Sequence, residues 1–355
     1  MNAASNPRIV LHVGAPKTAS TYLQRRLRAN SERLRARGIF VPVLPQVAAM
    51  AGNAKLLATA LSERPSLTFE RAFPEIEHSE LNPTKLVADL LRDWKRDSES
   101  VVLSAENFRP NHAARLRELL PNDIAIVVIL FVRRQDRWID SYFNQMVKTS
   151  EEHRSMSDFV AQLCDTAGER FCRPDWFAHY EAWKNAFGNC TIIFYVEVAS
   201  DVFSAFLNAA GFEAAPDLID IDRAQVSLNI FELAYLLELK KPITYEEFLR
   251  RRMAGEKASR KLGVHETRSI LSEADLARLR NRFDDSNRRL LSAIGRNGST
   301  LLELDANTSS DLYCNLPEFY DSAGYADFRK HADAIYARRN RRDRFRSLFK
   351  PARRK

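Results

Sequence analysis

The stretch over residues 8–27, RIVLHVGAPKTASTYLQRRL, constrains the fold of this chain more than any other. It begins with an apolar run, continues through a loop rich in hydroxyl groups, and ends in a segment whose leucines recur at helical spacing. An apolar run without polar alternation is typical of a strand that is buried on both faces of a parallel sheet. The sequence therefore predicts a strand, a tight loop and a helix packed on the sheet, which together form the core of an α/β fold.

The loop over residues 15–21, APKTAST, places one lysine and several hydroxyl groups where a helix begins. Free backbone N–H groups and the positive end of the helix dipole favour an anion there, although an ordinary connection capped by Ser or Thr has the same composition. A nucleotide triphosphatase loop reads GxxxxGK[ST], but counting from Gly14 puts Ala19, Ser20 and Thr21 at its last three positions. An ATP or GTP loop is therefore disfavoured.

The lysine instead follows Gly14 by three residues and precedes TASTYLQ. This loop resembles the 5′-phosphosulfate loop of sulfotransferases that use 3′-phosphoadenosine 5′-phosphosulfate (PAPS), and it is similar to the bacterial PKTGTTYLQ type. The resemblance implies that Lys17 is catalytic and that the loop binds the donor. The family has a glycine where Ala19 stands, and a residue with a Cβ atom is expected to resist a positive φ. The donor contacts that the resemblance implies here are Pro16, Lys17, Thr18, Ala19, Ser20, Thr21 and Tyr22.

A second informative segment starts with the apolar residues 101–103, which predict another strand, and continues through Ser104 to Glu106. In open α/β sheets ligands bind outside the carboxyl ends of the strands, so Glu106 is expected on the same rim as the Lys17 loop. Taken alone, a glutamate after a strand is more often a solvated loop residue or the first acid of a helix. Bacterial carbohydrate sulfotransferases look similar here, with Ser-x-Glu at the strand end, and this resemblance implies that Glu106 is the general base.

A third segment, residues 124–132, has no polar side chain and predicts an interior strand. It ends at Arg133 and leads into an amphipathic helix that contains Ser141. By itself, an arginine-rich strand end indicates a solvated loop. Sulfotransferases bind the 3′-phosphate of the donor with an arginine at this strand end and a serine eight residues later, so the resemblance implies this role for Arg133 and Ser141. The planar fork of donors on a guanidinium suits a phosphate.

The formal net charge of +8 would suit a protein that binds nucleic acid, but its distribution argues against that class. Residues 338–355 hold ten lysines or arginines and one aspartate, which leaves the rest of the chain close to neutral. Nucleic acid is therefore not expected as a partner. The basic tail has two interpretations: a disordered, solubilising segment, or a segment that contacts an anionic membrane or an acidic glycan.

Two further clusters have open interpretations. The aromatic residues between positions 171 and 183 are typical of a core and could also form a platform for a sugar. The basic patch over residues 250–261 is interpreted either as a solvated helix face or as a lid over the nucleotide.

The fold class predicted from these patterns is a P-loop-type α/β protein with a mostly parallel sheet flanked by helices. A single domain is expected over residues 1–337, with a helical insertion over 46–96, a mainly helical part over 230–337, and the tail over 338–355. The four cysteines include no CxxC pair, which favours a reducing compartment, although a link between Cys164 and Cys172 stays open. No signal peptide or stretch of about 18 apolar residues is evident, so a cytoplasmic location, with peripheral contact at the inner membrane, is expected.

The function that the resemblance implies is sulfonate transfer from PAPS to a hydroxyl of a carbohydrate, on a cell-surface polysaccharide or a glycolipid, by a bacterial enzyme. No paired carboxylates or Walker-B pattern accompany the loop, so no metal is required for this chemistry. Two alternatives stay open. One is a P-loop phosphotransferase or kinase that uses ATP, and the other is a non-catalytic protein that binds polyanions or membranes.

Overall fold

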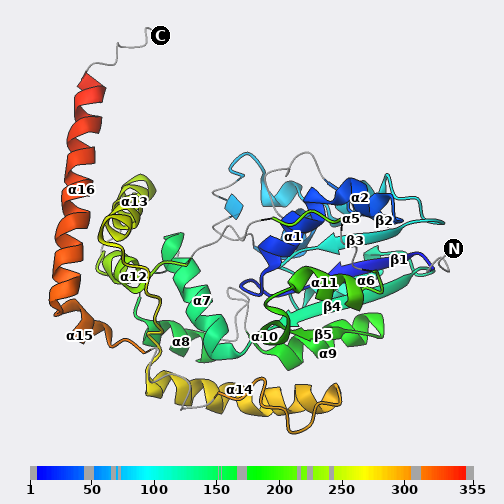
Figure 1. Cartoon of the computed structure of the whole chain (residues 1–355). Helices are drawn as coiled ribbons and strands as arrows, with labels where there is room; N and C mark the ends of the chain where they lie inside the picture. The colour runs from blue at the N-terminus through cyan, green and yellow to red at the C-terminus, as the bar shows by residue number, and fades with distance from the viewer. Residues whose placement is uncertain are drawn as a thin grey trace. The chain divides into compact units, whose positions relative to one another are not determined.

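The computed structural model describes residues 6–43, 52–64, 69–70, 73–150, 152, 154–165, 174–213, 217–221, 227–239, 244–304 and 313–348, and the side chains of the last range to residue 338. The chain forms two compact units that alternate along the sequence (Figure 1). The first unit comprises Met1–Trp138, Ala167–Gln225 and Arg280–Leu304, and the second comprises Ile139–Thr166, Val226–Leu279 and Asp305–Lys355. The domain boundaries expected from the sequence stay a prediction.

The first unit contains a five-stranded sheet with the order β2-β3-β1-β4-β5, and every pairing between these strands is parallel. This confirms the predicted α/β fold class. The short strand β2 lies at one edge, while β1 lies in the centre between β3 and β4. The strands are β1 (Arg8–His12), β2 (Ile39–Phe40), β3 (Ser100–Ser104), β4 (Ala125–Val132) and β5 (Thr191–Phe194).

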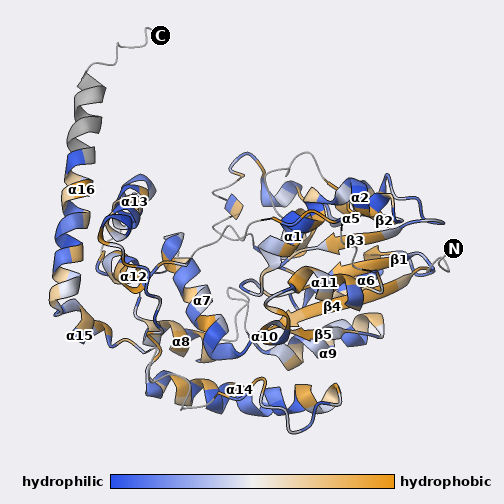
Figure 2. Ribbon diagram, viewed as in Figure 1, coloured by the Kyte–Doolittle hydropathy of each residue, from blue (hydrophilic) through white to orange (hydrophobic). Residues whose placement is uncertain are grey.

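The strands form where consecutive residues are apolar. Because successive side chains of a strand point to opposite faces, both faces of the sheet are hydrophobic (Figure 2). On one face Val10, Val102 and Ile129 pack against apolar side chains of α1 (Ser20–Ala29) and α11 (Val202–Ala209). Helices α6 (His112–Leu119) and α9 (Trp176–Phe187) pack on each other, and α9 also packs on β4. The sheet is therefore sandwiched, and its carboxyl edge is the place where loops can carry function.

The aromatic cluster belongs to this core. Trp176 and Trp183 on α9 are completely buried, and Tyr180 is 6% exposed. These rings support the core interpretation and do not form a platform for a sugar. Phe171 lies outside the described residues. The other elements of the first unit are α2 (Ser31–Arg35), α3 (Lys55–Ala60), η2 (His78–Glu80), α5 (Pro83–Leu91), α10 (Tyr195–Val198) and the second part of α14 (Glu273–Ala293).

The second unit is helical in its described part. Helix α7 (Gln135–Lys148) enters it at residue 139, and α8 (Met156–Asp165) and the first part of α14 belong to it. Helices α12 (Ile230–Leu237) and α13 (Tyr245–Leu262) pack on each other and on α16 (Ala323–Leu348), and α15 (Leu316–Tyr320) also packs on α16. Tyrosine hydroxyls donate to carboxylates between these helices, as in Tyr325 to Glu238 at 2.6 Å. These tyrosine hydroxyls are thus paired within the unit.

The basic patch lies on α13, and its arginines are paired with acids of the same helix. Arg251 lies 3.7 Å from Glu247, and Arg252 lies 3.4 Å from Glu256. Both guanidinium groups also contact other helices of this unit, since Arg251 lies 3.7 Å from Asp333 on α16 and Arg252 donates to the carbonyl of Lys148 on α7 at 3.1 Å. The two interpretations of the patch stay open. Helix α16 continues through residues 338–348, so the backbone of this part of the basic tail is helical, and residues after 348 lie outside the described part.

Two other expectations concern the pairing of the cysteines and helices that could cross a membrane. Cys172 lies outside the described residues, so the pairing with Cys164 stays open. None of the helices in the described ranges has the length and apolar character needed to cross a bilayer.

Candidate functional site

The loop between β1 and α1 turns through two residues in the left-handed region. Lys17 has a φ of 67° and Ala19 a φ of 64°. A residue with a Cβ atom pays roughly 1–2 kcal/mol for this conformation. The expectation that Ala19 would resist the loop's curvature is therefore corrected: the alanine adopts the left-handed turn and bears the strain.

Two hydroxyl groups stabilise the loop from inside. Thr18 donates to the carbonyl of Ala15 at 2.7 Å, and Ser20 donates to the same oxygen at 3.1 Å. Both side chains are buried, whereas Lys17 is half-buried. The N-cap residue of α1 is Ala19, whose side chain cannot cap the helix. The helix dipole favours an anion at the first N–H groups of α1.

Arg133, directly after β4, reaches this loop. Its Nη1 donates to the carbonyl of Lys17 at 3.1 Å, across 116 positions of sequence, and its guanidinium lies 5.3 Å from the centre of the Tyr195 ring. The next residue behaves differently, because Arg134 forms a bidentate pair with Asp136 at 2.8 and 2.7 Å. Arg133 thus contacts the loop, and its role in binding a 3′-phosphate stays a prediction.

Two buried indoles hold the backbone at this junction. Trp138 Nε1 donates to the carbonyl of Pro16 at 2.8 Å, and Trp176 Nε1 donates to the carbonyl of Arg133 at 2.8 Å. Their rings meet edge to face, 6.0 Å apart. The sequence predicts neither of these two hydrogen bonds. The available signal is that a buried indole N–H needs an acceptor, but sequence does not identify which carbonyl accepts.

Glu106 lies in the turn that follows β3. His12 and Ser104 are register partners at the ends of β1 and β3, so the two strands end at the same edge of the sheet. The side chain of Glu106 is 23% exposed, and its Oε1 lies 3.8 Å from Lys55 Nζ. This is an ion pair without a direct hydrogen bond, which leaves the carboxylate open to other partners.

Lys55 starts α3, and the segment before it is fixed to the end of β3. The amide of Asn53 donates to the carbonyl of Val102 at 2.8 Å and accepts from the N–H of Ser104 at 2.8 Å. The N–H of Ala54 donates to the carbonyl of Ser104 at 3.2 Å. Sequence reasoning missed Lys55, because an isolated lysine before an apolar helical segment carries no signal of its position beside Glu106.

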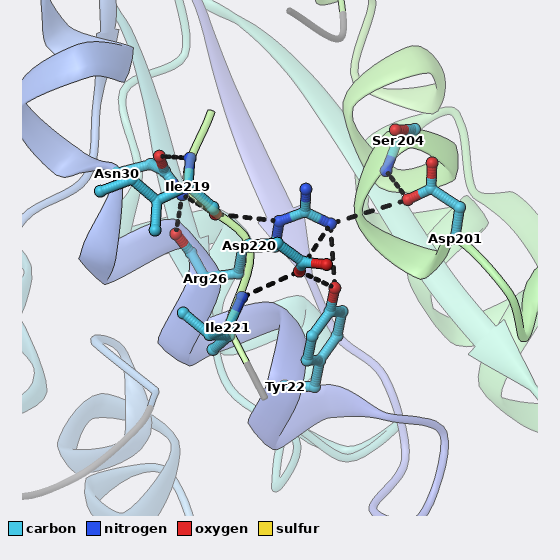
Figure 3. A network of polar contacts seen from close by, with 8 residues as sticks. All are labelled: Tyr22, Arg26, Asn30, Asp201, Ser204, Ile219, Asp220 and Ile221. Carbon is cyan, nitrogen blue, oxygen red and sulfur yellow. Dashed lines mark hydrogen bonds and ion pairs between the residues drawn. The ribbon is translucent and has the colours of Figure 1, made fainter. Parts of the chain in front are cut away.

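The outer surface of α1 binds the segment 217–221 (Figure 3). Tyr22 donates to Asp220 Oδ1 at 2.7 Å, and Arg26 donates to the Tyr22 hydroxyl at 2.9 Å. Asn30 exchanges two hydrogen bonds with the backbone of Ile219, at 2.9 and 2.7 Å. Burial and the hydrogen bond to Asp220 raise the pKa of Tyr22. The structure thus gives the Tyr22 hydroxyl a protein partner, and its contact with a donor stays a prediction.

Three other predicted residues have simpler positions. Pro16 lies half-buried in the loop, and Thr21 lies half-buried in the first turn of α1. Ser141 lies on α7, in the part that belongs to the second unit, so its pairing with Arg133 stays a prediction.

No protein-family model matches the chain, and no curated protein sequence does. Among solved structures, a sulfotransferase from Alicyclobacillus acidocaldarius matches at 16% identity, with a TM-score of 0.43, over 80% of this chain and 100% of that chain. The sulfotransferase domain from the curacin biosynthetic pathway matches at 14% identity, with a TM-score of 0.34, over 78% of this chain and 97% of that chain. Likenesses this distant carry no argument about function, which has to rest on the site.

Proposed function

We propose that this chain is a PAPS-dependent sulfotransferase that moves a sulfonate group to a hydroxyl of a carbohydrate. The observation that carries the proposal is the hydrogen bond from Arg133 to the carbonyl of Lys17. It joins the two segments that the sequence assigns to the two phosphates of the donor, the Lys17 loop and the end of β4. The two segments follow the neighbouring parallel strands β1 and β4, and ligands bind outside the carboxyl ends of such strands in open α/β sheets.

The loop residues act on the leaving group. In the reaction, the bond between the sulfonate sulfur and the bridging oxygen of the 5′-phosphate breaks, and adenosine 3′,5′-bisphosphate leaves with added negative charge. Lys17 and the first N–H groups of α1 face an anion in both the ground state and the transition state. Donors fixed by the surrounding protein need no reorganisation as the charge develops. The hydroxyls of Thr18 and Ser20, which donate to Ala15, keep the loop in this shape.

The rim residue Glu106 acts on the acceptor. The acceptor hydroxyl forms a new bond to sulfur as the old one breaks, and its proton passes to the carboxylate of Glu106. A positioned base typically contributes 10²–10⁴-fold. Lys55 Nζ lies 3.8 Å from Glu106 Oε1, too far for a direct hydrogen bond, so the carboxylate oxygens are able to accept the proton.

The carbohydrate acceptor, on a polysaccharide or a glycolipid, rests on the resemblance of the Lys17 loop and of Ser104-x-Glu106, and so does the bacterial source. The cytoplasmic location is proposed from the cysteine pattern, which favours a reducing compartment. Contact with an anionic membrane rests on the charge of residues 338–355. Deleting these residues should preserve turnover of a small soluble acceptor and weaken sedimentation with vesicles that contain anionic lipid. Unchanged sedimentation would contradict the membrane contact and leave the solubilising role.

The donor is tested by thermal unfolding with adenosine 3′,5′-bisphosphate, ATP and AMP at equal concentration. A ligand present at 100 times its Kd stabilises by about 2.7 kcal/mol, so the bisphosphate should raise the Tm most. Greater protection by ATP with Mg²⁺ would favour a phosphotransferase instead. No protection by any of the three would favour the non-catalytic alternative.

A further inference from the structure

His12, the last residue of β1, is completely buried beneath the loop, and no step of the proposed mechanism uses it. Its Nδ1 lies 2.8 Å from the hydroxyl of Ser104, at the end of β3, and Gln24 Nε2 on α1 donates to the same hydroxyl at 3.1 Å. The ring also packs edge-on against Phe131 and Phe206. The ends of β1 and β3 and the first half of α1 thus meet around the imidazole of His12. β1 precedes the loop, α1 follows it, and β3 precedes Glu106.

The Ser104 hydroxyl accepts from the amide of Gln24 and can in turn donate its own proton to His12 Nδ1. In that arrangement the proton of a neutral ring sits on Nε2. Burial lowers the pKa of His12 to about 3, which keeps the ring neutral. This arrangement presents an N–H at Nε2, and it is the tautomer on which the inference is built.

That N–H faces Gly14, at the entry to the loop. Nε2 is buried and has no hydrogen-bond partner among the described residues. A Cβ atom placed on Gly14 would lie 2.5 Å from Nε2, so the glycine is required by the ring beneath it. Buried donors without acceptors are rare in native proteins because they cost free energy. An acceptor that arrives with a ligand would remove this cost.

We propose that His12 is a positioning residue for the donor site: held by Ser104 and Gln24, it supports the loop through Gly14, and its Nε2–H gains an acceptor oxygen when the donor binds. The inference rests on the proposed function, because it takes the loop to be the donor site. It adds a link between the donor loop and the end of β3, two residues before Glu106, that the mechanism alone does not contain.

The first test observes the ring directly in the wild-type protein. With histidine labelled by ¹⁵N, His12 should give the Nε2–H tautomer at neutral pH, and adenosine 3′,5′-bisphosphate should shift its Nε2–H resonance downfield, as expected for a new hydrogen bond. A resonance that does not respond while the bisphosphate binds would overturn the inference and leave the proposed function intact. Failure of the bisphosphate to bind at all would overturn both. Repeating the titration with AMP shows whether the 5′-phosphate alone suffices.

The second test uses variants. His12→Gln retains an N–H at a similar distance and should keep donor affinity within about threefold, whereas His12→Leu should weaken the bisphosphate at least tenfold and raise the KM for PAPS more than it changes the KM for the acceptor. The matched control is His112→Leu, since His112 is also buried but both its ring nitrogens have partners, Ser62 and the Arg109 N–H. This control should lose stability without losing donor affinity. Equal donor affinities in His12→Leu and wild type would refute the positioning role, and the labelled wild type decides the question if the variant does not fold.

Discussion

The donor loop and the Glu106 rim lie at the same edge of the sheet but are held in different ways. The loop is fixed by Trp138 on Pro16, by Arg133 on Lys17, and by two of its own hydroxyls on Ala15. Glu106 lies in a turn and, within the described ranges, has one recorded partner, the 3.8 Å ion pair with Lys55. The loop is therefore preorganised by the protein, whereas the side chain of Glu106 is held less tightly.

Under the proposed function, this difference matches the demands of the two substrates. A donor that is always the same nucleotide rewards a preorganised site, because little ordering remains to be done on binding. An acceptor hydroxyl must approach, lose its proton and depart as a sulfate ester, so the base needs room. Variants in the loop should therefore change donor affinity and stability together. Variants on the rim should change turnover and leave both largely unaffected.

The largest expected effect is on the rim. Glu106→Gln keeps the shape of the side chain but cannot take the acceptor's proton, so turnover should fall by about 10²–10⁴-fold. The affinity for adenosine 3′,5′-bisphosphate and the Tm should stay near the wild-type values. Steady-state kinetics with calorimetric binding measures both. Retention of more than about a tenth of the wild-type turnover would exclude Glu106 as the base.

Lys17→Ala is the loop counterpart of this variant. It should lower turnover and also weaken the donor, because the ammonium contacts the anion in the ground state and in the transition state. A loss of turnover with unchanged donor affinity would remove the distinction between the two regions.

The next effect concerns Arg133. Hydrogen bonds to charged groups are worth about 1.5–3 kcal/mol, so Arg133→Ala should weaken adenosine 3′,5′-bisphosphate by about 10–100-fold and weaken AMP much less. Arg133→Lys should recover only part of the loss, because an ammonium lacks the guanidinium fork. Arg134→Ala serves as the neighbouring control, since Arg134 pairs with Asp136. Equal losses for the bisphosphate and AMP would argue against the 3′-phosphate role.

Lowering the pH should destabilise the folded chain, because His12 is buried beneath the Lys17 loop. The pKa of His12 is about 3 in the folded chain because of burial, against an ordinary value of 6.5. Between pH 6.5 and about 3, His12 is protonated in the unfolded chain but neutral in the folded chain. The free energy of unfolding therefore decreases as the pH is lowered through this range. At pH 5 this amounts to about 2 kcal/mol. Denaturant midpoints at pH 7 and 5 should show a smaller difference in His12→Gln; identical differences would contradict this prediction.

The smallest effect concerns the strained alanine. Ala19→Gly removes the Cβ from a residue with a φ of 64°. The folded state should gain roughly 0.5–1 kcal/mol after the greater freedom of glycine in the unfolded chain is subtracted. Ala182→Gly, on the helix α9, is the opposite control and should cost a similar amount. Destabilisation by both substitutions would show that the loop is unstrained.

The sequence predicts the strands well because their signal is local. Residues 124–132 have no face that could meet water, and β4 occupies that run almost to the residue. The meeting of Arg133 with the loop is predictable too, since both segments end buried parallel strands. Lys55 and the two indole hydrogen bonds are not predictable, because they depend on where a loop docks and which carbonyl a ring can reach. The role of His12 is not predictable either, because the residue lies within an apolar run that indicates only a strand.

The network between α1 and the segment 217–221 has a consequence for how the chain is made. Tyr22 and Arg26 belong to a helix that is synthesised about 200 residues before their partner Asp220. At the usual rates of roughly 5–20 residues per second, translation of that interval takes about 10–40 s. In the first part of this interval β1 lacks both of its neighbours in the finished sheet, because β3 ends at Ser104 and β4 at Val132. The nascent chain must therefore shelter an apolar strand while the ribosome completes the sheet around it.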